Sequence, residues 1–448
     1  FFFLPLIIML ITLDRQDKRS QRNKPKEEMK INYVSKNLSD FLELPDRDIF
    51  AKTKPFYEFT EELAAHEYHH WARILTSPSE RRVKILDRYT NEVREMVMMA
   101  SNNYLGLTTH PAVVEAARKA LEKYGTGAGS VPLLGGYLDL HRELEHKLAQ
   151  MKGCEDAIIF TSGYSSNVGC VSALVRKNDV AINDRLNHAS IIDGCYLSGG
   201  TLRTFKHNDL ASLEKVLQST EKQGYNGKLI IVDGVFSMDG DITDLPGIKA
   251  LADRYHARIM IDEAHATGVI GENGRGTPEH FSLEGQIDLV AGTLSKALAV
   301  VGGFVASSKE VVNYLRFYAR SHMFSTALPP ASAGALIAGI DVIQNEPQLR
   351  KKLWSNIKYM ISNLKQMGFN LGNAETAIIP IIIGDEDILK KISREVHQAG
   401  IFVNSVYYPA VPKKLSRLRL SLMATHTQED LDDTLAVLER VGKKYGLI

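Results

Sequence analysis

Two short stretches decide the fold: RIMIDEAH at residues 258–265 and DLVAGTLSK at residues 288–296. Each opens as an apolar run and ends in polar side chains, which is typical of a buried parallel strand that stops at the edge of a sheet. Similar runs alternate with amphipathic helical stretches such as Leu210–Leu217 and Leu245–Tyr255. This alternation predicts an α/β fold with a mainly parallel central sheet. The further strands are expected at Ala157–Phe160, Val180–Ile182, Leu229–Val232 and Phe304–Ala306.

The segments on either side of this sheet have different patterns. Residues 1–30 are expected to be a tail and a polar linker, residues 31–87 a mostly helical N-terminal arm, residues 88–330 the large domain, and residues 331–448 a smaller α+β domain. The apolar stretch at residues 1–13 is shorter than the roughly 18 residues that cross a bilayer. Membrane contact is therefore expected to be peripheral at most. The strands of the small domain are expected at Ile378–Ile383, Ile401–Val406 and Leu418–Leu422.

The overall composition excludes several classes of protein. The 448 residues include 54 basic and 53 acidic side chains and no long basic run, so there is no electrostatic reason to expect nucleic acid as a partner. None of the three cysteines lies in a CxxC pair. This argues against a disulfide framework and a thiolate zinc site, and it favours a reducing, cytoplasmic compartment. We expect no bound metal.

Asp262 and Lys296 follow two neighbouring expected strands, and ligands gather at the carboxyl ends of parallel strands. A carboxylate keeps a pyridine nitrogen protonated, so that the ring can act as an electron sink. A lysine amine forms a Schiff base with an aldehyde. Hydroxyl groups such as those of Thr293 and Ser295 donate hydrogen bonds to a phosphate. Together the four residues predict a pyridoxal phosphate site.

Further residues behind expected strands fit the same site. Ser162, Gly163 and Tyr164 follow one such run, where the N-terminus of a helix could cradle the phosphate. His188 follows another run and could stack on the cofactor ring. Ser237 could hydrogen-bond the hydroxyl group of the ring.

Two other motifs suggest different chemistry. DEAH at residues 262–265 is also the box of a class of helicases, but that interpretation needs a phosphate loop GxxxxGK[ST], which the sequence lacks. HEYHH at residues 66–70 matches HExxH, in which two histidines one helical turn apart bind zinc and the glutamate acts as a base. The segment has a helical pattern, but no third ligand for His66 and His70 is identifiable. A polar helix face is therefore favoured over a metalloprotease site with Glu67 as the base.

From about Ser101 to its end the sequence resembles the α-oxoamine synthases, a family of fold-type I pyridoxal-phosphate enzymes. The resemblance implies a C-acyltransferase that joins an amino acid to an acyl-CoA, usually with loss of carbon dioxide, to give an α-amino ketone. It rests on several long motifs in the family's order: SNNYLGL (101–107), NHASIIDG (187–194), DGVFSMDG (233–240), DEAHATG (262–268), GRG (274–276), GTLSK (292–296) and RLSLMATHT (419–427).

The resemblance also implies roles for residues around the cofactor ring. Lys296 matches the Schiff-base lysine, which also acts as acid and base at the α-carbon of the substrate. Asp262 matches the partner of the pyridine nitrogen, and His188 the residue that stacks on the ring. His265 and Ser237 match neighbours of the ring oxygen.

Other positions match residues that bind the phosphate or the substrate. Thr293 matches a phosphate ligand. Ser325 and Thr326 match positions that reach the phosphate in the partner subunit, which implies an obligate homodimer. Arg419 matches the arginine that grips the substrate carboxylate, a bidentate task suited to guanidinium. Asn103 matches a residue near the amino-acid substrate.

The substrates are less closely defined than the family. ARSHMFSTALPP at residues 319–330 and FVNSVYYPAVP at residues 402–412 are most similar to bacterial serine palmitoyltransferase, so serine and a long-chain acyl-CoA are expected, as in sphingolipid synthesis. A glycine C-acetyltransferase or an 8-amino-7-oxononanoate synthase is the alternative. An arginine of the family is replaced by Val131, and an apolar wall there would suit a long acyl chain.

A non-catalytic partner subunit, the alternative from another class, would lack Lys296. The motifs argue against an aminotransferase.

Overall fold

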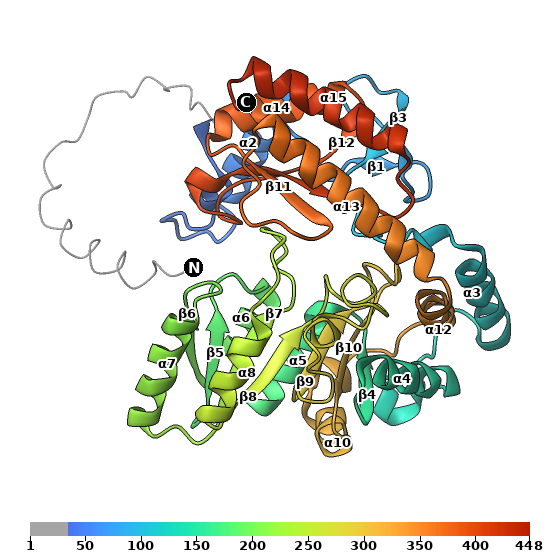
Figure 1. The fold of residues 1–448 in the computed structure, drawn as a ribbon, viewed down its shortest axis with the longest axis vertical. Coiled ribbons are helices and arrows are strands. Elements are labelled where there is room, and N and C mark those ends of the chain that lie inside the picture. Colours follow the sequence, from blue (N-terminus) through green and yellow to red (C-terminus); the bar gives the residue numbers. More distant parts are fainter. Residues whose placement is uncertain (1–34) are drawn as a thin grey trace, which may run out of the picture.

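The computed structural model describes residues 35–448, so the tail and linker expected at residues 1–30 lie outside the described residues. Within this range a central sheet of seven strands has the order β4-β10-β9-β8-β7-β5-β6, and β10 alone is antiparallel to its neighbours (Figure 1). The mainly parallel sheet is confirmed. The strands are β4 (Asp156–Phe160), β5 (Val180–Asp184), β6 (Thr201–Phe205), β7 (Lys228–Asp233), β8 (Arg258–Asp262), β9 (Leu289–Thr293) and β10 (Gly303–Ser307).

Helices cover both faces of this sheet because alternate side chains of each strand point to opposite faces. In β8, Ile259 and Ile261 join one hydrophobic core, whereas Met260 joins the other. The first core is closed by α4 (Asp139–Lys152), α7 (Leu210–Gln223), α8 (Leu245–Arg254) and α12 (Pro330–Asn345). The second is closed by α5 (Gly163–Leu174), α6 (Ala189–Ser198) and α10 (Lys309–Tyr318).

The C-terminal part forms the expected smaller α+β domain above the sheet (Figure 1). Its strands have the antiparallel order β11-β14-β13 and pack against three helices. The α12 helix, which lies inside the range expected for this domain, packs instead against α3 (Pro111–Tyr124) and α4. The elements of the domain are α13 (Pro347–Met367), β11 (Ile378–Ile382), α14 (Glu386–Gln398), β13 (Asn404–Val406), β14 (Arg417–Ser421) and α15 (Gln428–Lys444).

The expectation of a mostly helical arm at residues 31–87 is wrong for its second half. In the described part of the arm, α2 (Thr53–Ala65) and a short 3-10 turn at Leu38–Phe41 are followed by β1 (Ile74–Leu75) and β2 (Arg82–Leu86). The β2 strand pairs with β3 (Val93–Met98), so the hairpin crosses the boundary expected at residue 88. The sequence RVKIL of β2 alternates between polar and apolar residues over its first four positions, which favours a strand.

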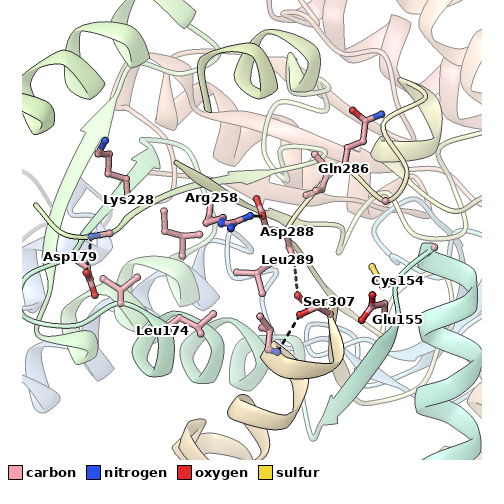
Figure 2. Close-up of a pocket in the computed structure, with 18 of the residues that line it drawn as sticks. Cys154, Glu155, Leu174, Asp179, Lys228, Arg258, Gln286, Asp288, Leu289 and Ser307 are labelled. Atoms are coloured by element: carbon pink, nitrogen blue, oxygen red, sulfur yellow. Dashed lines mark hydrogen bonds and ion pairs between the residues drawn. The ribbon is translucent and has the colours of Figure 1, made fainter. Parts of the chain in front are cut away.

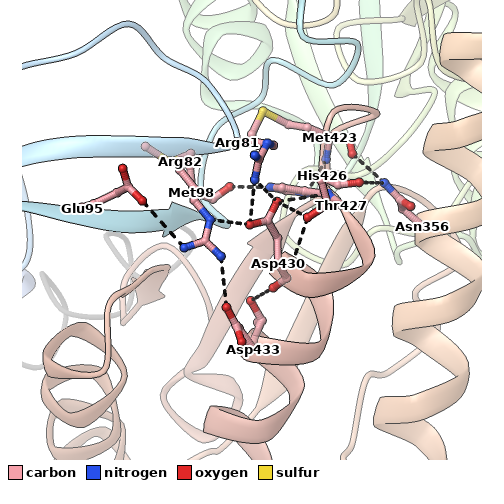
Figure 3. Close-up of polar contacts among 11 residues, drawn as sticks. Arg81, Arg82, Glu95, Met98, Asn356, Met423, His426, Thr427, Asp430 and Asp433 are labelled. Carbon is pink, nitrogen blue, oxygen red and sulfur yellow. Dashed lines mark hydrogen bonds and ion pairs between the residues drawn. The ribbon is translucent and has the colours of Figure 1, made fainter.

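The hairpin joins the C-terminal domain through backbone and side chains. The β3 strand pairs in parallel with β12 (Ile401–Phe402). Nη1 of Arg81 and Nε of Arg82 lie 2.8 and 2.7 Å from the two carboxylate oxygens of Asp430, which is buried at the start of α15 (Figure 3). The same carboxylate accepts a 3.0 Å hydrogen bond from the backbone of Thr427 and so caps the helix.

None of the helices in residues 35–448 is long and apolar enough to cross a membrane.

Candidate active site

A cavity of about 220 Å³ lies at the carboxyl ends of the central strands. A larger cavity, of about 710 Å³, lies at the opposite edge, where Lys228, Arg258 and Leu289 begin their strands (Figure 2). None of the residues predicted for the cofactor site lines that larger cavity. The smaller one is lined by Ser162, Gly163, Tyr164, Asn167, His188, Asp233, Val235, Ser237, Asp262, Ala264, His265, Thr293, Ser295 and Lys296. The structure thus brings together ten of the residues that were predicted from the sequence.

Asp262 ends β8 and is held as a carboxylate acceptor inside this cavity. Its oxygens accept hydrogen bonds from Nδ2 of Asn167 at 2.6 Å and from the backbone of Ala264 at 2.9 Å. Asn167 also donates to Oγ of Ser190 at 2.9 Å, and that hydroxyl lies 2.8 Å from Nδ1 of His188. A continuous chain of hydrogen bonds therefore links the wall at His188 to the carboxylate. Asn167, which lies one turn into the helix that follows β4, was not predicted from the sequence.

Lys296 follows β9, and its Nζ lies 2.7 Å from Nε2 of His265. Burial lowers the pKa of Lys296 to about 8, although the nearby charge of Asp262 raises it. A substantial share of the amine is therefore uncharged near neutral pH, as attack on an aldehyde requires. Burial and the charge of Lys296 hold the pKa of His265 well below its ordinary value, so that ring stays neutral.

Hydroxyl groups and the N-terminus of α5 line another side of the cavity. Ser162 caps α5, and its Oγ accepts a 3.0 Å hydrogen bond from the backbone of Ser165. Oγ1 of Thr293 lies 2.8 Å from Oγ of Ser295. A Cβ atom on Gly163 would lie 2.7 Å from Cβ of Thr293, so glycine allows the helix to approach this pair. A helix N-terminus beside hydroxyl groups suits a phosphate.

Asp233 is a cavity residue that the sequence analysis missed, although it ends β7 as Asp262 ends β8. The two residues are register partners on adjacent strands. Burial, together with the charge of Asp262, raises the pKa of Asp233 well above its ordinary value. Its position at a strand end was the available signal.

Four predicted residues lie outside the lining of the cavity. Arg419 of β14 is buried, and its Nε donates a 2.6 Å hydrogen bond to the carbonyl oxygen of Ser237. Nδ2 of Asn103 donates to the backbone of Ser79 and to Thr108. Ser325 and Thr326 border a separate small hollow beside Tyr137 and His141. The partner-subunit role of this pair and the substrate contact of Asn103 stay predictions.

The HExxH segment does not form a zinc-binding helix. The α2 helix ends at Ala65, and Glu67 has a φ of 57°, so His66 and His70 do not lie on successive turns. Among residues 35–448 no group of three or more His, Cys, Asp or Glu side chains could hold a metal ion. The expectation of a polar helix face here is wrong, because the helix ends before the motif.

The chemistry of the residues that line the cavity fits pyridoxal phosphate. A buried carboxylate is available for the pyridine nitrogen, an amine of lowered pKa for the aldehyde, and a helix N-terminus with hydroxyl groups for the phosphate. Oδ1 of Asn167, inside the same lining, is buried and has no protein partner. The site thus holds the donors and acceptors that this group needs.

The model of the family described as aminotransferase class I and II matches residues 94–438. The chain belongs to the aminotransferase class I and II family. Within this family it is an α-oxoamine synthase, a pyridoxal-phosphate-dependent C-acyltransferase. The 8-amino-7-oxononanoate synthase of Thermoanaerobacter pseudethanolicus is 46% identical over 391 residues, which are 87% of this chain and 97% of that protein.

Two other relatives of this α-oxoamine synthase carry different names. The 4-hydroxy-2,2'-bipyrrole-5-methanol synthase of a Serratia species is 43% identical over 412 residues, which are 92% of this chain and 63% of that protein. The structure of Sphingomonas wittichii serine palmitoyltransferase superposes with a TM-score of 0.84 at 32% identity, covering 90% of this chain and all of that one (100%). The family is therefore shown, while its members differ in the product they make.

Proposed function

We propose that this α-oxoamine synthase condenses alanine with a seven-carbon dicarboxylic acyl thioester, as 8-amino-7-oxononanoate synthases do. The observation that carries the proposal is the 46% identity to such a synthase over 97% of its length, against 32% for serine palmitoyltransferase structures. The higher identity favours the 8-amino-7-oxononanoate synthase, which the sequence suggested as an alternative, over the expected pair of serine and a long-chain acyl-CoA.

The name of the product defines the substrates by carbon count. 8-Amino-7-oxononanoate has nine carbons, with an amino group on C8 beside a ketone on C7. C8 and C9 correspond to alanine after loss of its carboxyl group. C1 to C7 correspond to a dicarboxylic acyl chain whose thioester carbonyl becomes the ketone.

We assign the ring-binding part of the cavity as follows. Lys296 would hold the aldehyde carbon, and Asp262 would keep the pyridine nitrogen protonated. His188 would stack on the ring, and Ser237 and His265 would lie near the ring oxygen. The hydrogen-bond chain from His188 through Ser190 and Asn167 to Asp262 supports this assignment, because it fixes the carboxylate and the stacking ring relative to each other.

The phosphate is assigned to the N-terminal end of α5. In a homodimer, which we also propose, Ser325 and Thr326 would complete the phosphate site of the partner subunit, since in their own subunit they border a different hollow. Within one subunit the phosphate would be bound by residues that line the cavity, namely Ser162, Gly163, Tyr164, Thr293 and Ser295.

The protein side chains then carry out binding and proton transfer. Bound pyridoxal phosphate supplies an electron sink for the negative charge at the α-carbon of the amino acid. Lys296 removes and returns the proton at that carbon, and a pKa of about 8 suits both tasks near neutral pH. Arg419 holds the substrate carboxylate, with its guanidinium oriented by the carbonyl oxygen of Ser237.

A matrix of amino acids and acyl donors tests the proposal. Alanine, serine and glycine are each combined with pimeloyl-CoA, palmitoyl-CoA and acetyl-CoA, and free thiol is measured. We expect kcat/KM for alanine with pimeloyl-CoA to exceed kcat/KM for every other pair at least about tenfold, since even a single methylene group in an apolar pocket provides about that discrimination. Preference for serine with palmitoyl-CoA or for glycine with acetyl-CoA would overturn the substrate assignment. Lys296→Ala is the control for thiol release that does not depend on the enzyme.

A further inference from the structure

The loop of residues 235–243, which follows β7, lies between the two domains and carries Ser237. An isolated bridge between Val235 and Ile242 closes it. Val235 and Ser237 line the cavity, and the carbonyl oxygen of Ser237 accepts the hydrogen bond from Nε of Arg419. The loop therefore supplies one of the hydrogen bonds that orient the arginine that we assign to the substrate carboxylate.

On the large-domain side, the imidazole of His207 bridges two carboxylates. Its Nδ1 lies 3.2 and 3.3 Å from the two oxygens of Asp184, which ends β5. Its Nε2 lies 2.9 Å from Oδ2 of Asp241, which belongs to the loop. The side chains of His207, Asp184 and Asp241 are 18%, 1% and 7% exposed, so both ion pairs are shielded from water.

Neighbouring groups fix the same geometry. The ring of Phe236 meets the His207 ring edge to face, with centroids 4.3 Å apart. Asn208 has a φ of 49°, a left-handed conformation that asparagine tolerates. In this conformation the backbone N–H of Asn208 donates to Oδ2 of Asp184 at 2.9 Å. Its side-chain Nδ2 donates to Oδ2 of Asp241 at 3.1 Å. Both carboxylates thus receive donors from two consecutive residues.

On the small-domain side, the loop is held by two strands. Nη1 of Arg417 in β14 lies 2.8 Å from the carbonyl oxygen of Met238 and 2.8 Å from Oδ1 of Asp239. The carbonyl oxygen of Gly240 accepts a 2.9 Å hydrogen bond from Oγ1 of Thr376. A Cβ atom on Gly240 would lie 2.1 Å from the carbonyl oxygen of Ile378 in β11, so the loop rests directly on that strand. Arg417 and Thr376 bind the same turn that His207 holds from the opposite side.

We infer that His207 is a positioning residue: as an imidazolium between Asp184 and Asp241, it fixes the loop of residues 235–243 and thereby aims Arg419 at the carboxylate of the amino-acid substrate.

The charge of the imidazolium is central to this role. Burial alone would lower the pKa of His207, but the two carboxylates outweigh burial and raise the pKa to about 10. A neutral ring has one donor and could serve only one of the two carboxylates. The other would then be a buried anion without its cation, which is unfavourable. Within residues 35–448 the side chains in contact with the ring are Asp184, Asp241 and Phe236, and of these the two aspartates are the charged groups.

The first experiment compares His207→Gln with His397→Gln as a matched control. His397 is also buried and also paired with a carboxylate, at 3.1 Å from Asp87, but it has no contact with the loop. We expect His207→Gln to raise the KM for the amino acid about tenfold, because an arginine displaced by a fraction of an ångström binds the carboxylate less well. The KM for the acyl donor is expected to stay unchanged. His397→Gln is expected to leave both KM values unchanged, whatever it does to stability.

The second experiment needs no substrate. Amide hydrogen exchange is measured for residues 235–243, and His207→Gln is expected to speed it about tenfold relative to the wild type and to His397→Gln. Exchange that stays slow in His207→Gln, or an unchanged amino-acid KM together with a lower melting temperature, would overturn the inference. The role given to Arg419 rests on the proposed function, but the exchange result does not, so the two can fail separately.

A third experiment tests whether the positive charge of His207 is required. In Asp241→Asn the imidazolium loses one carboxylate, so the pKa of His207 falls toward its ordinary value. The amino-acid KM, taken as a ratio to that of the wild type, is then expected to rise as the pH rises through that range, because the ring loses its proton. His207→Gln is expected to show a ratio that does not vary with pH. A flat ratio in Asp241→Asn would contradict the proposed role of the charge.

Discussion

The hydroxyl group of Tyr104 lies 2.6 Å from Nδ1 of His265, and Nε2 of the same ring lies 2.7 Å from Nζ of Lys296. Burial raises the pKa of Tyr104 to about 12, so the hydroxyl keeps its proton. The imidazole is neutral as well. The lysine therefore ends a row of three hydrogen-bonded groups in which it alone changes charge near neutral pH.

Tyr104→Phe is expected to lower the free energy of unfolding by about 1–3 kcal/mol, because it leaves a buried ring nitrogen of His265 without its partner. Denaturant unfolding followed by fluorescence measures this loss. Tyr314→Phe, in an exposed tyrosine that stacks on Tyr318, is the control. Equal stability of the two variants would show that the contact between Tyr104 and His265 contributes nothing.

Reconstitution of the apoenzyme is expected to become faster as pH rises through about 8, because the uncharged amine of Lys296 attacks the aldehyde. The growth of the visible absorbance band after mixing with pyridoxal phosphate gives the rate. In Asp262→Asn the midpoint should move to lower pH, since the charge of Asp262 raises the pKa of Lys296. A midpoint that moves to higher pH would contradict the electrostatic account.

Lys296→Ala is expected to abolish the visible absorbance band of the bound cofactor and to reduce thiol release by at least roughly 10²–10⁴-fold, the usual contribution of an acid–base group. Lys249→Ala, which removes a half-buried lysine paired with Asp253 on α8, should change neither. A variant that lacks Lys296 but keeps the band would disprove the assignment of this residue.

A comparison of Gly240→Ala with Gly224→Ala separates the conformational cost of a side chain at a positive φ from the steric cost of a Cβ atom that meets a neighbouring strand. Both glycines have left-handed φ angles, 73° and 70°, but nothing lies within 4 Å of a Cβ atom placed on Gly224. Gly224→Ala should cost about 1–2 kcal/mol of stability from conformation alone. Gly240→Ala should cost about 1–3 kcal/mol more, because its Cβ atom meets the backbone of Ile378. Equal losses would mean that the loop can move away from β11.

His70 is expected to make the protein less stable in acid. Burial lowers the pKa of His70 to about 2, helped by the charges of His397 and Arg73. Below about pH 6.5 the unfolded chain takes up a proton at His70 and the folded chain does not. The free energy of unfolding therefore decreases as the pH is lowered, by up to about 1.4 kcal/mol per pH unit. Denaturant unfolding at several pH values should show a weaker dependence in His70→Gln. His66→Gln, at an exposed ring, should behave as the wild type.

The sequence predicted those features that depend on local pattern. Continuous apolar runs predicted six of the seven strands of the central sheet, but TLRTF at residues 201–205 has no such run and was missed. The polar residues that follow those runs in the sequence predicted most of the lining of the cavity, because the carboxyl ends of parallel strands meet at one edge of the sheet. Asp233 obeyed the same rule and was overlooked beside Asp262.

Features that depend on distant contacts were not predictable. The β3 strand was not predicted, because VREMVM does not alternate and one of its partners, β12, lies some 300 residues further along the chain, whereas β2 was assigned to the helical arm despite the alternation in RVKIL. Asn167 acquires its role only when the helix after β4 brings it to Asp262. His207 shows no sign of its two carboxylates in the local sequence, because Asp184 and Asp241 come from other segments.

The contact of Arg81 with Asp430 joins residues that are 349 positions apart. A ribosome releases the N-terminal hairpin long before it makes the helix that pairs with it. During synthesis the two arginines and the free edge of β3 must remain without their partners while the whole central sheet emerges. The small domain can therefore close only after α15 has been translated, and a nascent chain that stops before α15 leaves this hairpin open to chaperones and proteases.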